Sequence, residues 1–195
     1  MNKNDLRYIK TEQIIRKSFI ACIKKNGFEK TTVSMICAEG LISRNAFYLH
    51  FTDKYDLLDR LFDEFRARLI SNFVSNTAGS MKAKDILDLT NKYLDVIEEN
   101  KSDFLFLMKC SRERMENVIH EIIIEMPARK IIPDYEKKVS NIKTMLNIRY
   151  MFTAMVAFTE LWLKNTDKIS KEDAAFELYQ LCEKATMMFY NALDL

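Results

Sequence analysis

The stretch SRNAFYLHFTDK, residues 43–54, brings several kinds of polar side chain together within about three helical turns. Arg44 can donate two parallel hydrogen bonds to guanine, and Asn45 can pair in a similar way with adenine. Tyr48 and His50 can donate hydrogen bonds to phosphate oxygens. These residue types, so close together, indicate a surface that reads base edges and contacts the sugar–phosphate backbone of DNA.

The same stretch carries aromatic side chains that a fully solvated helix would not keep. Phe47 and Phe51 are four residues apart and therefore share one face of a helix, to which Ile42 also belongs. Ser43 can cap the first turn of that helix. The spacing predicts a short helix whose aromatic side chains point inward and whose polar side chains point outward, with His50 near the edge of the outer face.

Capping residues divide the rest of the chain around this helix. A first helix is expected to begin after Asn4 or Asp5 and to end at Asn26, and Asp53 is the natural N-cap of a fourth. Two short helices joined by the turn Gly40–Ile42 predict a helix-turn-helix. The remaining helices are expected at Val33–Glu39 (capped by Thr31 or Thr32), Lys54 to about Ser75, Lys84–Glu99, Ser102–Arg112, Met115–Met126, Asp134–Asn165 and Ser170–Ala192.

Glycine and proline are too scarce for a fold rich in β-turns. The 195 residues include three glycines and two prolines, and 48% of them are hydrophobic, which is enough for a substantial core. No segment reaches the roughly 18–20 uninterrupted apolar residues that span a membrane. Residues 1–13 also lack the apolar middle of a secretion signal. We therefore expect an all-α protein located in the cytoplasm, with no membrane partner.

Charge and cysteine usage agree with this interpretation. Residues 1–55 hold ten Lys or Arg and five Asp or Glu, a net charge of +5, whereas the whole chain has +2 and the remainder therefore −3. A positive N-terminal part favours an anionic partner. The four cysteines are scattered without a C-x-x-C pair, so we interpret them as small apolar side chains in a reducing compartment.

The sequence contains none of the common catalytic motifs that would indicate an enzyme. It has no Gly-rich phosphate loop, no nucleophile elbow and no His/Cys/Asp cluster at the spacing of metal ligands. His120 stands alone in NVIHEIIIE, where a structural histidine is more common than a catalytic one. We expect no catalytic residue, no metal and no cofactor.

The segment Thr31–Leu58, TTVSMICAEGLISRNAFYLHFTDKYDLL, resembles the N-terminal signature of the tetracycline-repressor (TetR) family of bacterial regulators. The shared pattern consists of a Thr-Val pair, a buried Ile-Ala-like pair, a serine, an aromatic run and a lysine that opens the next helix. It covers about residues 10–62. The resemblance implies phosphate contacts at Thr32, Ser43, Tyr48, His50 and Lys54, and base-reading positions at Ser34, Arg44, Asn45 and Ala46. It also implies a helix-turn-helix domain at 1–53 and an effector-binding and dimerisation domain at 54–195.

The chain departs from the family pattern in two places. The family usually has glycine in the turn where this chain has Leu41, with Gly40 one position early. A left-handed Leu41 would cost on the order of 1 kcal/mol; the alternative is a turn reshaped around Gly40. Asn45 and Ala46 stand where the family often has Gly and Thr, so base preferences do not carry over.

The last two expected helices are apolar around most of their circumference, and such helices are buried on both sides. A homodimer through a four-helix bundle would cover the second side and would present two recognition helices to a pseudo-palindromic operator. The resemblance implies the same dimer and, within each subunit, an effector pocket. Candidate lining residues, each of which could equally be ordinary core, are Phe104, Phe106, Met108, Met115, Met145, Phe152, Met155 and Trp162.

The leading hypothesis is a dimeric, ligand-responsive DNA-binding regulator, a repressor released from double-stranded DNA by a small, largely apolar effector. Two alternatives stay open. One is a structural or ligand-binding DNA protein of the same fold that has no effector, and the other is a helical enzyme with an incidental helix-turn-helix.

Overall fold

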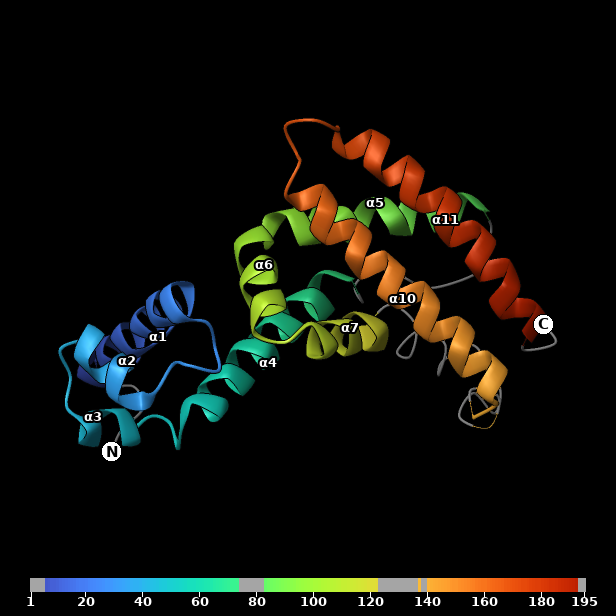
Figure 1. Cartoon of the computed structure of the whole chain (residues 1–195). Coiled ribbons are helices and arrows are strands. Elements are labelled where there is room, and N and C mark those ends of the chain that lie inside the picture. The colour runs from blue at the N-terminus through green and yellow to red at the C-terminus, as the bar shows by residue number, and fades with distance from the viewer. Residues whose placement is uncertain (1–5, 74–82, 123–136, 138–139, 193–195) are drawn as a thin grey trace. The chain divides into compact units, whose positions relative to one another are not determined.

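The computed structural model describes residues 6–73, 83–122, 137 and 140–192. All regular secondary structure in these residues is helical (Figure 1), which confirms the all-α class. The labelled helices are α1 (Leu6–Asn26), α2 (Val33–Glu39), α3 (Arg44–Tyr48), α4 (Lys54–Phe73), α5 (Ala83–Glu99), α6 (Lys101–Cys110), α7 (Arg112–His120), α10 (Ile142–Leu163) and α11 (Lys171–Ala192).

The chain forms two compact units. The first comprises Met1–Phe65 with Phe106–Arg112, and the second comprises Arg66–Leu105 with Glu113–Leu195. Helices α1 to α3 therefore belong to the first unit, and α5, α10 and α11 to the second. The functional boundary expected between residues 53 and 54 is not tested by these compact units and stays a prediction.

The first unit is held together by one face of α1. Ile15, Phe19, Cys22 and Ile23 recur at helical spacing on α1 and are all buried. Helix α1 packs against α2, and α2 packs against α3. The ring of Phe19 meets Phe28 edge-on, with ring centroids 6.3 Å apart. This small core is the base on which α3 rests.

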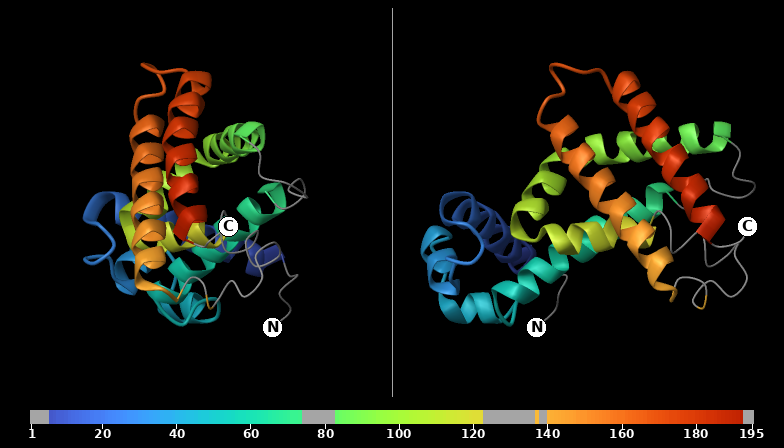
Figure 2. Two further views of the ribbon diagram at one scale, coloured as in Figure 1. Left: turned by 90° about the vertical axis from the view of Figure 1, so that its right-hand side faces the viewer. Right: turned by 45° about the vertical axis from the view of Figure 1, so that its right-hand side comes forward.

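The second unit is built around two long antiparallel helices. Helices α10 and α11 lie side by side in each view, and α11 also packs against α5 (Figure 2). A buried hydrogen bond of 2.9 Å joins the hydroxyls of Tyr93 on α5 and Thr159 on α10. Thr159 donates its own proton to the carbonyl of Met155 at 2.8 Å, so Tyr93 is the donor in this pair. Burial raises the pKa of Tyr93 far above its ordinary value, and the phenol stays a donor at every physiological pH.

One predicted helix begins later than expected. The predicted start at Asp134 lies outside the described residues, but a helix continuous from there is wrong, because Asn141 has extended backbone and α10 begins at Ile142. The side chain of Asn141 accepts the backbone N–H of Lys143 at 2.9 Å, which caps the first turn. The end of the helix expected at Met115–Met126 lies outside the described residues, and its start is three residues earlier, at Arg112.

Within the described ranges, no helix combines the length and the apolar character that crossing a membrane requires.

Candidate nucleic-acid interface

The predicted recognition helix is α3, and local and tertiary contacts both hold it. Ser43 caps it with extended backbone, and its Oγ accepts the N–H of Ala46 at 3.0 Å. A helix of five residues is not stable by itself. Phe47 and Phe51 anchor it, since their side chains are 0% and 1% exposed and their ring centroids lie 5.9 Å apart. The inward orientation expected for Phe47 and Phe51 is therefore confirmed, whereas Ile42, expected on the same face, is half-buried.

The opposite face of α3 is polar and open to solvent. Arg44, Asn45 and Tyr48 are all exposed, and Ala46 is half-buried. Tyr48 keeps 55% of its surface exposed while its ring edge meets Phe47, with ring centroids 5.5 Å apart. The outward orientation of the arginine, the asparagine and the tyrosine is confirmed.

Helix α2 presents a second polar edge beside α3. Thr32 is its N-cap, and the Thr32 Oγ1 accepts the N–H of Met35 at 3.3 Å. A hydroxyl that accepts in this way still has its own proton to donate, as a phosphate contact needs. The neighbouring Thr31 is fully buried, and its Oγ1 donates to the carbonyl of Gly27 at 2.8 Å. Of the two threonines that could have capped α2, Thr32 does so.

A side-chain hydrogen bond crosses from α3 to α2. The guanidinium Nη2 of Arg44 donates to the Oγ of Ser34 at 2.6 Å, and both residues are exposed. Spacing along the chain could not indicate this contact, because the two residues are ten apart and lie on different helices. Two of the four residues that the resemblance assigned to base reading are thus joined to each other.

The turn between α2 and α3 is strained at Leu41. Its φ is 51°, in the left-handed region, and its side chain is 94% exposed. Gly40 has ordinary right-handed geometry, with φ −87°. A Cβ at Gly40 would lie 2.7 Å from Ser18 Oγ and 3.0 Å from Ile14 Cγ2, so the close approach of α1 requires glycine there. The left-handed alternative for Leu41 is confirmed, and the turn reshaped around Gly40 is wrong.

Lys54, a predicted phosphate contact, is engaged inside the first unit. Its Nζ donates to the carbonyls of Phe28 at 3.0 Å and Glu29 at 3.1 Å. The ammonium also lies 4.6 Å from the ring centroid of Phe28 and 5.2 Å from that of Tyr55. These contacts connect the start of α4 to the turn before α2, and they leave one N–H of the ammonium for a phosphate.

Asp53 caps α4 as expected. Its Oδ1 accepts the backbone N–H groups of Tyr55 and Asp56, each at 2.8 Å. The exposed N–H groups in the first turn of α4 therefore have a hydrogen-bond partner next to them. This cap fixes the backbone position from which the Lys54 side chain extends.

His50 does not lie at the edge of the outer face. Its side chain is 1% exposed, its ring centroid is 3.9 Å from that of Tyr8, and its Nδ1 is 3.8 Å from Glu12 Oε2. The described residues provide no hydrogen-bond partner for Nδ1. Helix α3 ends at Tyr48, and the N–H of His50 turns back to the carbonyl of Phe47 at 2.9 Å, so the helical spacing used in the prediction does not reach residue 50. Burial lowers the pKa of His50, and the nearby Glu12 carboxylate opposes that shift.

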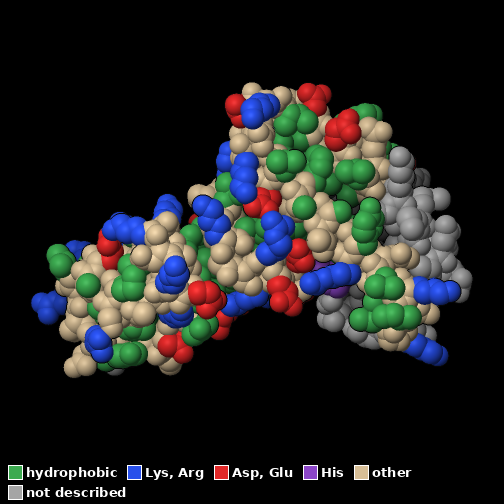
Figure 3. All heavy atoms as spheres, in the orientation of Figure 1, with side chains coloured by type: hydrophobic (Ala, Val, Ile, Leu, Met, Phe, Trp, Pro, Cys, Tyr) green, Lys and Arg blue, Asp and Glu red, His purple; other side chains and the backbone are tan. Residues whose placement is uncertain are grey.

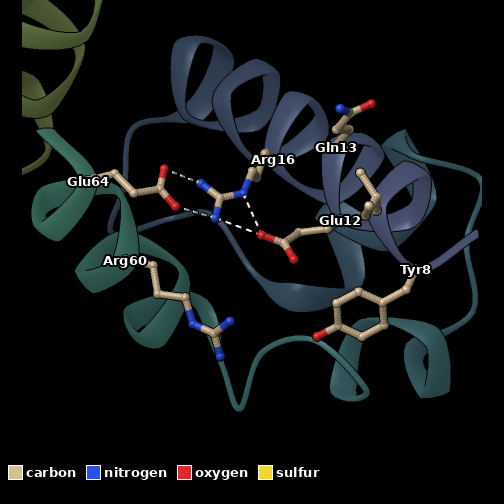
Figure 4. Close-up of a pocket in the computed structure, with 7 residues that line it drawn as sticks. Tyr8, Glu12, Gln13, Arg16, Arg60 and Glu64 are labelled. Carbon is tan, nitrogen blue, oxygen red and sulfur yellow. Dashed lines mark hydrogen bonds and ion pairs between the residues drawn. The ribbon is translucent and has the colours of Figure 1, made fainter. Parts of the chain in front are cut away.

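A hollow of about 480 Å³ lies between α1 and α4 within the first unit (Figure 4). Its lining residues are Tyr8, Ile9, Glu12, Gln13, Arg16, Arg60 and Glu64. Arg16 donates to both carboxylate oxygens of Glu64, at 2.8 and 2.7 Å, and to Glu12 Oε1 at 2.7 Å. None of the predicted site residues lines this hollow. The guanidinium of Arg16 on α1 and the carboxylate of Glu64 on α4 form two parallel hydrogen bonds, and this bidentate ion pair joins the two helices.

The predicted effector-pocket residues separate into three groups. Phe104, Met115, Phe152, Met155 and Trp162 are buried and belong to the second unit, whereas Phe106 and Met108 belong to the first. Met145 is 52% exposed on α10 and does not belong to an interior lining. Its neighbours Thr144 and Ile148 take the inward positions on that helix, which turns Met145 to solvent. No cluster of three or more metal-ligating side chains occurs among residues that the structure describes.

Comparison with known proteins finds a family model that matches the segment carrying this geometry. The family model for bacterial regulatory proteins of the tetR family matches residues 19–61. That segment contains α2, α3 and the turn between them, with parts of α1 and α4. No curated protein sequence matches this chain significantly.

Solved structures share the fold over nearly the whole chain. A TetR-like transcriptional regulator from Rhodococcus sp. RHA1 is 17% identical with a TM-score of 0.59, and the match covers 91% of this chain and 96% of that one. The fatty acid degradation regulator FadR from Bacillus halodurans is 16% identical with a TM-score of 0.57, covering 88% of this chain and 93% of that one. FadR from Bacillus subtilis, solved in complex with stearoyl-CoA, is 17% identical with a TM-score of 0.52, covering 87% and 96%.

The family signature coincides with the capped, outward-facing α3, and the helical fold beyond it agrees with the solved regulators. Residues 19–61 thus carry the N-terminal signature of the tetR family of bacterial regulatory proteins, and the chain as a whole shares its helical fold with solved TetR-like regulators.

Proposed function

We propose that the chain binds a pseudo-palindromic operator through α3 and the start of α2. The observation that carries this proposal is the division of α3 into a buried aromatic face and an exposed polar face. The proposed contact residues are Thr32, Ser43, Arg44, Asn45, Ala46, Tyr48 and Lys54, and Ser34 lies beside them, hydrogen-bonded to Arg44. His50, whose side chain is buried, supports the helix from behind and does not contact phosphate directly.

Each proposed contact follows from the chemistry of the exposed atoms. Arg44 reads guanine and Asn45 reads adenine, since both side chains present the required donors and acceptors to a major groove. Thr32 and Tyr48 donate hydroxyl protons to phosphate. The half-buried methyl of Ala46 suits contact with a thymine methyl group.

We infer a homodimer from an exposed apolar face on the second unit. On α10 and α11, seven large apolar side chains are each more than half exposed: Ile142, Met145, Leu146, Tyr150, Leu161, Phe176 and Leu181. Apolar side chains gather over these two helices on the face shown in Figure 3. An apolar patch shared between neighbouring antiparallel helices matches the isologous interface of a two-fold dimer. Such a dimer presents two copies of α3 to the two halves of an operator.

The proposed effector is a small, largely apolar molecule that enters the second unit. The buried aromatic and methionine side chains there suit an adaptable apolar cavity. Trp162 adds a polar element, because its Nε1 is buried and has no hydrogen-bond partner in the described part of the chain. The effector would act by binding the DNA-free form more tightly, so that the regulator, a repressor, leaves its operator.

The test combines genomic footprinting with binding to purified DNA. The dimer should bind its footprinted sites at least about 1,000-fold more tightly than random duplex of the same length at moderate salt. Equal affinity for both would contradict the proposal. Long-chain acyl-CoA esters are the first effector probe, since a FadR of the same fold holds stearoyl-CoA. Release of the operator by such a probe, but not by free CoA, would support an apolar effector. Sequence-specific binding that no probe relieves would favour a DNA protein without one.

A further inference from the structure

The hydrogen bond between α2 and α3 gives Ser34 a role different from base reading. Building on the operator binding proposed above, we propose that Ser34 is a positioning residue: its hydroxyl holds the Arg44 guanidinium in the orientation that reads guanine. The Nη2 of Arg44 lies 2.6 Å from Ser34 Oγ, a short and direct contact between two exposed side chains. Ser34 therefore shapes sequence preference through Arg44.

Hydrogen bonds of the turn and of the two helix caps position Ser34 and Arg44 beside each other. The N–H of Ile42 donates to the carbonyl of Cys37 at 3.0 Å, which closes the turn that joins α2 to α3. Thr32 caps α2 two residues before Ser34, and Ser43 caps α3 directly before Arg44. Both side chains therefore extend from capped first turns. Forming their hydrogen bond requires little further loss of backbone conformational entropy.

The bond leaves the reading edge of the arginine intact. A guanidinium has five N–H groups, and the bond to Ser34 occupies one of the two on Nη2. Two parallel donors therefore remain for the O6 and N7 atoms of guanine. No carboxylate within the described ranges forms an ion pair with Arg44, so its charge remains available to DNA. A long arginine side chain otherwise loses much rotamer freedom on binding, and a hydroxyl that holds it in place beforehand reduces that loss.

The inference predicts a loss of affinity confined to the preferred sequence. Ser34→Ala should weaken binding to that sequence about fivefold, the size of one ordinary hydrogen bond, and should leave binding to random duplex unchanged. Because Ser34 carries no charge, the dependence of affinity on salt concentration should also be unchanged. Ser34→Thr keeps the hydroxyl and should restore the preference.

The decisive experiment is a double-mutant cycle on the full-length dimer. Affinities are measured for wild type, Ser34→Ala, Arg44→Ala and the double variant against the footprinted operator and against versions with each base pair changed. If Ser34 acts through Arg44, Ser34→Ala will have no further effect in the Arg44→Ala background, and both single variants will lose preference at the same base pair. Additive effects, or losses at two different base pairs, would show that Ser34 contacts DNA independently and would overturn the inference.

Two controls keep this result distinct from other failures. Thr11→Ala removes a hydroxyl of the same unit that bonds only within α1, to the carbonyl of Arg7, and it should leave every affinity unchanged. If wild type shows no preference between operator and random duplex, the proposed function fails. If wild type discriminates but the cycle is additive, only the role of Ser34 fails. An increase in affinity for Ser34→Ala would mean that the bond holds Arg44 away from DNA, and it would also overturn the inference.

Discussion

The two units expose different kinds of side chain. In the first unit, the exposed face of α3 is polar and its buried face is aromatic. In the second, α10 and α11 expose large apolar side chains while a polar pair, Tyr93 and Thr159, is buried and satisfied. A polar surface on a tightly packed base suits contact with DNA, and an apolar surface suits contact with another protein chain. The difference supports the DNA partner proposed for the first unit and the protein partner proposed for the second.

The largest expected effect comes from placing a charge on the apolar face of α10. Leu146→Glu should raise the dimer dissociation constant by at least about 100-fold, because a carboxylate would be buried without a partner in the interface. Analytical ultracentrifugation measures this directly, and operator affinity should fall in parallel. The matched control is Leu6→Glu, an exposed leucine on α1 of the first unit, which should leave the dimer intact. A dimer unaffected by Leu146→Glu would place the interface elsewhere.

The second prediction concerns Lys54, whose ammonium serves the first unit internally. Lys54→Met should lower the free energy of unfolding by about 1–2 kcal/mol, because two carbonyls of the turn before α2 lose a charged donor. Urea denaturation measures the change, and Lys30→Met, an exposed lysine of that turn, is the control.

The salt dependence of DNA binding separates this structural role from phosphate contact. A Lys54 that mainly contacts phosphate would leave stability unchanged, and its loss would reduce the salt slope by about 1. That combination would contradict the internal role.

The third prediction concerns the strained turn. Leu41→Gly should raise the free energy of unfolding by about 0.5–1 kcal/mol, since glycine relieves the left-handed penalty but adds freedom to the unfolded chain. Gly40→Ala should do the opposite, because its new methyl would lie 2.7 Å from Ser18 Oγ. Thermal unfolding of both variants checks the pair. A loss of stability for Leu41→Gly would show that the apolar side chain of Leu41 stabilises the fold.

The smallest expected effect depends on pH. Burial lowers the pKa of His50 in the folded state below its ordinary value of 6.5, so between these two pKa values the unfolded chain binds more protons. The stability that neutral His50 contributes is therefore complete above about pH 6.5 and is lost as pH falls through the folded-state pKa. His50→Gln should flatten this part of the stability–pH curve. Parallel curves for the two proteins would contradict the assignment.

Local rules predicted the elements and the caps. Ser43, Thr32 and Asp53 each cap the helix that the sequence suggested, because a cap depends on residues two or three positions away. The inward face of Phe47 and Phe51 followed from their spacing alone. These features depend on separations short enough to be seen along the chain.

Tertiary contacts determine the side-chain orientations and hydrogen bonds that could not be predicted from the sequence. His50 and Met145 were placed wrongly because a helix end and two inward neighbours determine their orientation. The Lys54 contacts and the bond from Arg44 to Ser34 join residues 10 to 26 positions apart. A long, flexible cation can reach several partners, and only the fold selects among them.

The close packing of α1 against Gly40 also restricts the order in which this turn can change during evolution. A larger residue at position 40 meets Ser18 and Ile14, whatever stands at position 41. Glycine at position 41 would change nothing at these contacts, but a side chain at position 40 also requires Ser18 and Ile14 on α1 to move or to be replaced. The ancestry of this turn should therefore be readable at positions 14 and 18 in close relatives.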